Sequence, residues 1–126
     1  MEAYYLEATP KTPRLDFNPD ADTFVISGRS IPENSIEFYK PLLDWLENYV
    51  SNPKKSIIFE VKLEYFNTSS SKCMVEIFRK FEKIHSAGHE LTVEWYYDEE
   101  DEDMQESGED FKDIIKVPFK MIQNKD

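Results

Sequence analysis

Two stretches of the chain alternate between apolar and polar residues. In residues 57–66 the odd positions from Phe59 to Tyr65 are apolar or aromatic, and the even positions between them are charged. Residues 91–97 repeat the pattern, with Thr92, Glu94 and Tyr96 at the even positions. Successive side chains of a strand point to opposite faces of its sheet, so each stretch predicts a strand with one buried face and one solvated face.

Two other stretches carry apolar residues at helical spacing. Between the predicted strands, residues 69–87 place Met74, Ile77, Phe78, Phe81 and Ile84 on one stripe, and Gly88 follows as a C-terminal cap. Residues 34–50 form a second amphipathic helix, opened by Asn34 and Glu37 in a capping-box pattern. Pro41 predicts either a kink in this helix or a separate first turn.

Short extended segments at residues 4–8, 14–17 and 23–27 precede the first helix, separated by prolines and by Gly28. The Pro and Asx residues of the 18–22 segment favour a turn, so the strands on either side of it are expected to pair as a hairpin. A strand, a helix and a strand in sequence predict a parallel pair. A short amphipathic segment around Phe111, Ile114 and Ile115 and a last strand over residues 117–122 complete the expected elements.

The expected fold class is therefore α/β: a single domain over residues 1–126, with a mixed sheet and helices packed mainly on one face. Its length of 126 residues agrees with one domain. The 26 acidic residues outnumber the 15 basic ones, giving a net charge of −11, which excludes a phosphate-binding nucleic-acid surface. No apolar run is long enough to span a membrane and no signal peptide is evident, so we expect a cytoplasmic protein without membrane partners.

Few residues offer metal, disulfide or enzyme chemistry. The single cysteine, Cys73, cannot form an internal disulfide, and two histidines, His85 and His89, do not make a zinc cluster. A small enzyme using Cys73 or an acidic pair would need a base, a nucleophile and an oxyanion site that the sequence does not assemble. The acidic run 98–103 lacks the glycine and ligand spacing of a calcium loop, and is interpreted as a solvated surface segment that could attract a basic partner. No metal or cofactor is expected.

Two interpretations are open for four tyrosines, Tyr39, Tyr49, Tyr96 and Tyr97: they belong to a partner-binding surface, or they are packed in the core or sheet. Aromatic residues are enriched at protein-binding hot spots, yet most tyrosines of a small α/β domain belong to its core or sheet.

The most distinctive segment is a run of four hydroxyl residues, Thr68 to Ser71, between a predicted strand and a predicted helix. Ligands and modifications gather at the carboxyl ends of strands in open α/β sheets, and a helix start favours negative charge. A phosphate on Thr68 would be well placed there. The simpler interpretation is that Asn67 or Thr68 caps the helix and the serines fill its first turn. No glycine-rich phosphate loop is present, so a nucleotide site is not expected.

Three segments together resemble the SiaC-type regulatory phosphoprotein family. They are Ile31-Pro32-Glu33-Asn34-Ser35, Tyr65-Phe66-Asn67-Thr68-Ser69-Ser70 and Val93-Glu94-Trp95-Tyr96-Tyr97-Asp98. The resemblance spans nearly the whole chain. It implies a bacterial, non-enzymatic protein with a fold akin to anti-sigma-factor antagonists, phosphorylated by a dedicated kinase and dephosphorylated by a phosphatase.

The resemblance also implies a target and a site. In that family the unphosphorylated form is expected to bind and activate a diguanylate cyclase, which raises cyclic di-GMP and favours biofilm or aggregation, and phosphorylation releases it. The phosphoacceptor falls on Thr68, with Ser69 as the alternative. The partner surface is expected to include Asn67, Thr68, Ser69, Ser70 and Lys72. Two alternatives stay open: an unmodified structural adaptor, and a sigma-factor-type regulatory antagonist.

Overall fold

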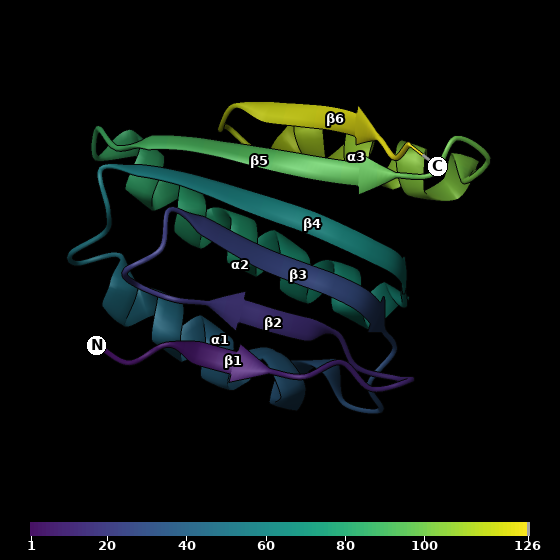
Figure 1. The fold of residues 1–126 in the computed structure, drawn as a ribbon, viewed down its shortest axis with the longest axis horizontal. Helices are drawn as coiled ribbons and strands as arrows, with labels where there is room; N and C mark the ends of the chain where they lie inside the picture. The colour runs from purple at the N-terminus through teal and green to yellow at the C-terminus, as the bar shows by residue number, and fades with distance from the viewer. Residues whose placement is uncertain (126) are drawn as a thin grey trace.

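Six strands form one mixed sheet in the order in which they occur along the chain (Figure 1). The structure is a computed structural model that describes residues 1–125. Its elements are β1 (Tyr4–Leu6), β2 (Arg14–Phe17), β3 (Thr23–Ser30), α1 (Ser35–Tyr49), β4 (Ser56–Phe66), α2 (Thr68–Ser86), β5 (Glu90–Tyr97), α3 (Glu102–Ile114) and β6 (Phe119–Gln123). The pairs β1·β2 and β2·β3 are antiparallel, and the pairs from β3 to β6 are parallel. The predicted α/β class is confirmed.

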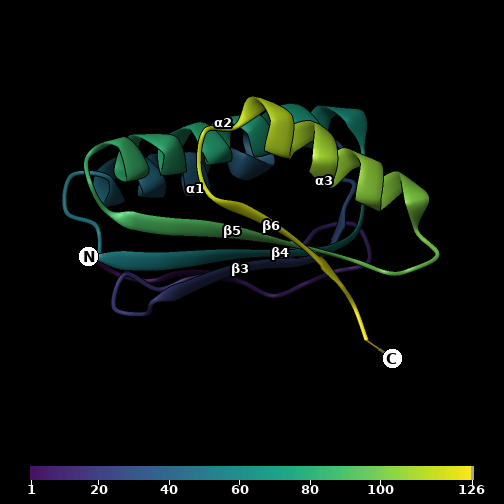
Figure 2. The ribbon, with the colours of Figure 1, turned by 90° about the horizontal axis from the view of Figure 1, so that it is seen from above.

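All three helices lie on one face of the sheet (Figure 2). The buried odd positions of β4 and β5, such as Phe59, Val61 and Val93, meet these helices. Aromatic rings fill much of the space between the layers, with the Phe59 and Phe81 centroids 4.7 Å apart. No helix covers the other face (Figure 2). The strand positions that alternate with the buried ones include Glu60, Lys62 and Glu94.

The predicted alternation of β4 is wrong at its end, where Tyr65 is exposed rather than buried. The register with β3 shifts between Gly28 and Arg29, so that Gly28 pairs with Leu63 and Arg29 with Tyr65. Glu64 is therefore an extra residue on β4, and an extra residue reverses the alternation that follows it. Phe66 turns toward the helices in place of Tyr65 and packs near Trp95.

The hairpin between β2 and β3 forms as predicted, with Leu15 opposite Ile26. The last strand runs over Phe119–Gln123 instead of residues 117–122, and two boundaries of the N-terminal strands also differ from the expectation. The first strand ends at Leu6 instead of residue 8, and β3 continues to Ser30 instead of ending before Gly28. Gly28 adopts φ +96°, a conformation that glycine tolerates, so it lies at the irregularity within the strand and does not separate two elements.

Helix α1 runs unbroken through Pro41, so its first turn is not separate. Asn34 caps it by accepting a hydrogen bond from the Glu37 backbone N–H at 3.0 Å, as predicted. The buried stripe of α1, which includes Tyr39, Leu42 and Leu46, packs onto the sheet and holds the helix together on both sides of the proline.

The acidic run is exposed to solvent as expected, apart from the half-buried Asp101, and α3 begins inside it. Asp101 caps this helix, its carboxylate accepting from the Met104 N–H at 3.0 Å, and Glu102 and Asp103 occupy the first turn. Carboxylates at this end are favoured by the helix dipole and by the free N–H groups. The buried side chains of Met104 and Phe111 then attach α3 to the sheet, and the Met104 carbonyl accepts from the Trp95 indole N–H at 3.0 Å.

Candidate functional site

The turn from β4 into α2 lies at the carboxyl edge of the parallel strands, where Phe66 pairs with Ser30 at the end of β3. Asn67 is the N-cap of α2, its side-chain oxygen accepting from the Ser70 N–H at 2.9 Å. Its own N–H donates to the Ser30 carbonyl at 3.0 Å. Asn67 thus caps the helix, as one of the two residues expected to do so, and Thr68 is the first helical residue.

The four hydroxyl residues that follow occupy different environments. Thr68 is exposed, and among residues 1–125 its carbonyl accepts from the Ser71 hydroxyl at 3.0 Å while its own hydroxyl has no hydrogen bond to protein. Ser69 is exposed too, but its hydroxyl contacts the Ser35 hydroxyl at 2.7 Å and the Asn67 side-chain oxygen at 3.2 Å. Ser70 is fully buried. Thr68 therefore has the one hydroxyl of this turn that is both exposed and unengaged in the described part of the chain.

A chain of buried hydroxyls fastens the turn to its neighbours. The Ser30 hydroxyl donates to Ser70 Oγ at 2.8 Å, and the Ser70 hydroxyl donates to the Ser30 carbonyl at 3.1 Å. Because the single Ser30 proton is used in this way, the Tyr39 hydroxyl, 2.6 Å from Ser30 Oγ, must be the donor to it. Burial raises the pKa of Tyr39 well above its usual value, which keeps this phenol protonated as the network requires. The network joins β3, α1 and α2 at one point.

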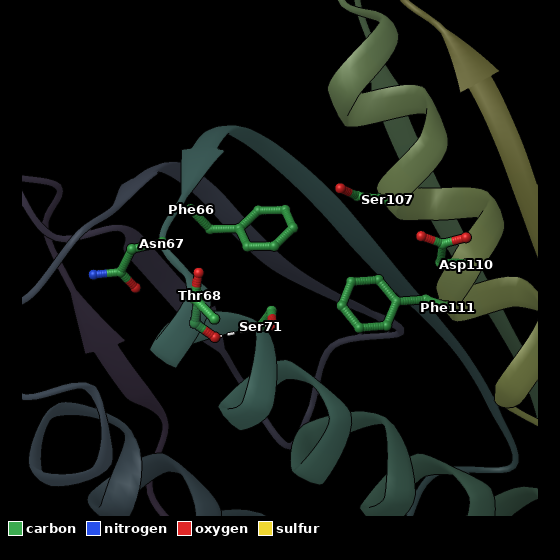
Figure 3. A pocket seen from close by; sticks show the side chains of 7 residues that line it. All are labelled: Phe66, Asn67, Thr68, Ser71, Ser107, Asp110 and Phe111. Atoms are coloured by element: carbon green, nitrogen blue, oxygen red, sulfur yellow. Dashed lines mark hydrogen bonds between the residues drawn. The ribbon is translucent and has the colours of Figure 1, made fainter.

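Thr68 borders an open hollow of about 280 Å³ between the start of α2 and helix α3. Phe66, Asn67, Thr68 and Ser71 line one side; Ser107, Asp110 and Phe111 of α3 line the other. Figure 3 shows Ser107 and Asp110 facing Thr68 across this space, with the Phe66 and Phe111 rings at its base. The hollow gives a phosphate on Thr68 room outside the core.

Two opposing fields act on that position. The first turn of α2 contains no acidic residue, so its free N–H groups present an uncompensated positive end that favours an anion. Asp110, exposed on the facing helix, disfavours one. An added phosphate would therefore lie between an attractive helix end and a repulsive carboxylate.

The cysteine and the two histidines considered from the sequence do not add a reactive or metal-binding group to this site. Burial, and next the charge of Glu76, raises the pKa of the Cys73 thiol, which is only 5% exposed, so the thiolate is disfavoured. His89 Nδ1 lies 3.0 Å from the Lys54 carbonyl. His85 Nδ1, near the other end of α2, is buried and has no hydrogen-bond partner among residues 1–125. Within residues 1–125 no three histidine, cysteine or carboxylate side chains are grouped as metal ligands.

The four tyrosines considered as core or partner-surface residues fall into two groups. Tyr39 and Tyr49 are core residues, whereas Tyr96 and Tyr97 are partly exposed. Lys72 is exposed on α2.

Sequence reasoning missed two parts of the site. The Ser30 and Ser35 hydroxyls, which anchor Ser70 and Ser69, were not singled out, although two serines flank the Ile31-Pro32 motif. Ser107 and Asp110 were missed because nothing local indicates that α3 faces α2.

Comparison with known proteins gives one consistent answer. The profile described as "SiaC family regulatory phosphoprotein" matches residues 6–124. A protein of Pseudomonas aeruginosa (strain UCBPP-PA14) is 30% identical over 119 residues, covering 94% of each chain. No helix within residues 1–125 is long and apolar enough to cross a bilayer.

Solved structures agree. Apo-SiaC from P. aeruginosa superimposes with a TM-score of 0.89 at 29% identity, covering 97% of this chain and 99% of that one. A crystal structure of the diguanylate cyclase SiaD in complex with its activator SiaC, also from P. aeruginosa, gives a TM-score of 0.88 at 29% identity, with 96% and 99% covered. In that complex SiaC is the activator and the cyclase SiaD is the enzyme. The chain belongs to the SiaC family of regulatory phosphoproteins.

Proposed function

We propose that this chain is a partner-switching regulator whose unphosphorylated form binds and activates a diguanylate cyclase. Phosphorylation of Thr68 by a dedicated kinase releases the cyclase, and a phosphatase restores binding. The level of cyclic di-GMP, and with it biofilm formation or aggregation, then rises with the fraction of the protein that is unphosphorylated. The activator role of the relative SiaC toward SiaD supports the choice of target.

One observation carries the choice of Thr68: its hydroxyl is exposed and makes no hydrogen bond to residues 1–125. A kinase can phosphorylate it without breaking an existing contact. Ser69 is the alternative, but a phosphate there would disrupt its contacts with Ser35 and Asn67. Thr68 is the acceptor that leaves the turn intact.

The partner surface in this proposal includes Asn67, Thr68, Ser69 and Lys72. Ser70 supports the surface from inside and does not contact the partner directly, because it has no exposed area. A phosphate adds about −1.5 to −2 charge and bulk at the rim of the hollow. Coupling energies of about 1–3 kcal/mol change affinity roughly 5- to 150-fold, which is enough for a switch.

The modification is tested on protein isolated from its host. Cleavage after Lys62 and Lys72 releases residues 63–72 as one peptide, whose fragment masses locate a phosphate on Thr68, Ser69, Ser70 or Ser71. Phosphate on Thr68 is expected. An unmodified peptide under all growth conditions would favour the structural adaptor.

The switch is tested by cyclase activation, read as cyclic di-GMP formed. Thr68→Ala is expected to activate like the unmodified chain, and Thr68→Asp to activate weakly. Thr68→Asn is the matched control, since it has nearly the shape of Asp without its charge. Equal activation by the Asp and Asn variants would contradict the electrostatic part of the mechanism, and activation of a sigma-factor pathway instead would identify the antagonist alternative.

A further inference from the structure

A second surface lies on the opposite side of the α2 start, between α1 and α2. It is an open groove of about 590 Å³ lined by residues of both helices. Ile36, Lys40 and Leu43 of α1 and Lys72, Cys73 and Glu76 of α2 line it. Ile36 is 77% exposed, more than the other exposed large hydrophobic residues of the described chain. An isoleucine so exposed beside an apolar groove is typical of a binding surface.

The groove is continuous with the phosphorylation site. Ser69 lines it as well, and the Ser35–Ser69 hydrogen bond of 2.7 Å holds the starts of both helices side by side. Lys72 lies four residues after Thr68, so both side chains are on the same face of α2 and within reach of each other. Lys72 forms no ion pair with residues 1–125. It therefore stands between the groove and the hollow beside Thr68.

We propose that this groove binds an amphipathic helix of the cyclase and that Lys72 forms an ion pair with an acidic residue of that helix. A phosphate on Thr68 then pairs with Lys72 instead, and the ion pair with the cyclase is lost. The inference rests on the proposed function and adds the surface and the cation through which the switch works. Two parallel helix starts with an apolar groove between them fit an apolar helix stripe, as in other helix-in-groove complexes.

The charges along the groove predict which end of the docked helix is acidic and which is basic. Lys72 lies toward the start of α2, and Glu76 lies about one turn further along the same helix. Lys40 and Asp44 of α1 pair with each other at 2.9 Å, so their charges largely cancel. The positive end of α2 adds to the cationic half. The docked helix is therefore acidic near Thr68 and basic at its other end, with apolar residues over Ile36 and Leu43.

Phosphorylation acts on this arrangement in two ways. The phosphate pairs with Lys72 within α2, which removes the cation from the partner. It also repels the acidic end of the docked helix. Both effects weaken docking without any change in the core.

The groove is tested with the purified cyclase that the wild-type chain activates. Ile36→Ser is expected to weaken its binding about tenfold or more, as loss of an apolar anchor does. Ile114→Ser is the matched control, because Ile114 is also an exposed helical isoleucine, 50% exposed, on α3. Since both side chains are exposed, both variants are expected to fold, which urea unfolding checks.

The role of Lys72 is tested by measuring cyclase binding for four proteins: the wild-type chain and Lys72→Gln, each with and without phosphothreonine at position 68. The substitution is expected to weaken binding of the unmodified chain about two- to fivefold, and to reduce the loss caused by phosphorylation by a similar factor. Lys83→Gln, on the same helix but outside the groove, is expected to do neither.

A ³¹P NMR titration tests the internal pair without any partner. Lys72→Gln is expected to raise the second pKa of the phosphate by about 0.3 unit, because a cation at i+4 favours the dianion. Equal binding by the Ile36→Ser and wild-type chains would overturn the groove while leaving the proposed function standing. An unchanged phosphate pKa would overturn the role of Lys72. Failure of the wild-type chain to bind any cyclase would remove the proposed function itself, and the docking site with it.

Discussion

Ser70 offers a direct test of how the phosphorylation turn is held. Its hydroxyl accepts from the Ser30 hydroxyl and donates to the Ser30 carbonyl, in a fully buried position. Ser70→Ala removes both bonds and a longer contact of 3.3 Å with the Ser35 hydroxyl. The Ser30 proton can turn only toward Tyr39, which already donates to it, so one buried donor is left without an acceptor.

The expected cost follows from these contacts. Leaving a buried donor without an acceptor costs about 1–3 kcal/mol, and this cost already includes the hydrogen bond that the donor loses; the second lost bond adds about 0.5 kcal/mol. Alanine gains about 0.5 kcal/mol over serine within a helix. The net loss in the free energy of unfolding is therefore about 2 kcal/mol.

Urea unfolding followed by tryptophan fluorescence measures this loss. With the m-values usual for small proteins, the midpoint should fall by about 1 M. Ser71→Ala is the control: Ser71 is the next residue of the same helix and donates only to the Thr68 carbonyl at its surface, so its loss should change stability by less than about 0.5 kcal/mol. If both variants unfolded at the same urea concentration, the buried hydroxyl chain would not stabilise the turn.

Three further predictions concern other parts of the molecule. Gly108→Ala would place a Cβ 2.5 Å from Trp95 Cδ1 and 2.7 Å from Met121 Cε, so overpacking should outweigh the helix gain of alanine and destabilise the chain by about 1–2 kcal/mol in the same urea assay. Because burial raises the Tyr39 pKa, the folded state keeps this phenol neutral; its contribution to stability should be constant below about pH 10, the unfolded pKa, and should fall above it, so Tyr39→Phe should make the loss of stability above pH 10 less steep. Burial also raises the Cys73 thiol pKa, so iodoacetamide at pH 8 should modify the folded chain at least about tenfold more slowly than the chain in urea.

What the sequence determined is local. Helical spacing and the caps Asn34 and Asn67 depend on residues within a few positions of one another, and these elements lie where the pattern predicted them, with α2 one residue shifted. The hydroxyl run at a strand-to-helix junction is also local, so the candidate site could be identified from residues 65–72 and the family resemblance.

Tertiary structure decided what depends on residues distant in sequence. The extra residue Glu64 on β4 follows from pairing with β3, and it exchanged Tyr65 for Phe66 in the core. Ser30 and Ser70, 40 positions apart, form one buried pair, and that pairing separates Ser70 from the exposed Thr68. Periodicity reports which face of an element is apolar. It does not report which other element packs against that face. Only the packing of the helices in the folded chain places Asp110 across from Thr68 and forms a groove beside Lys72.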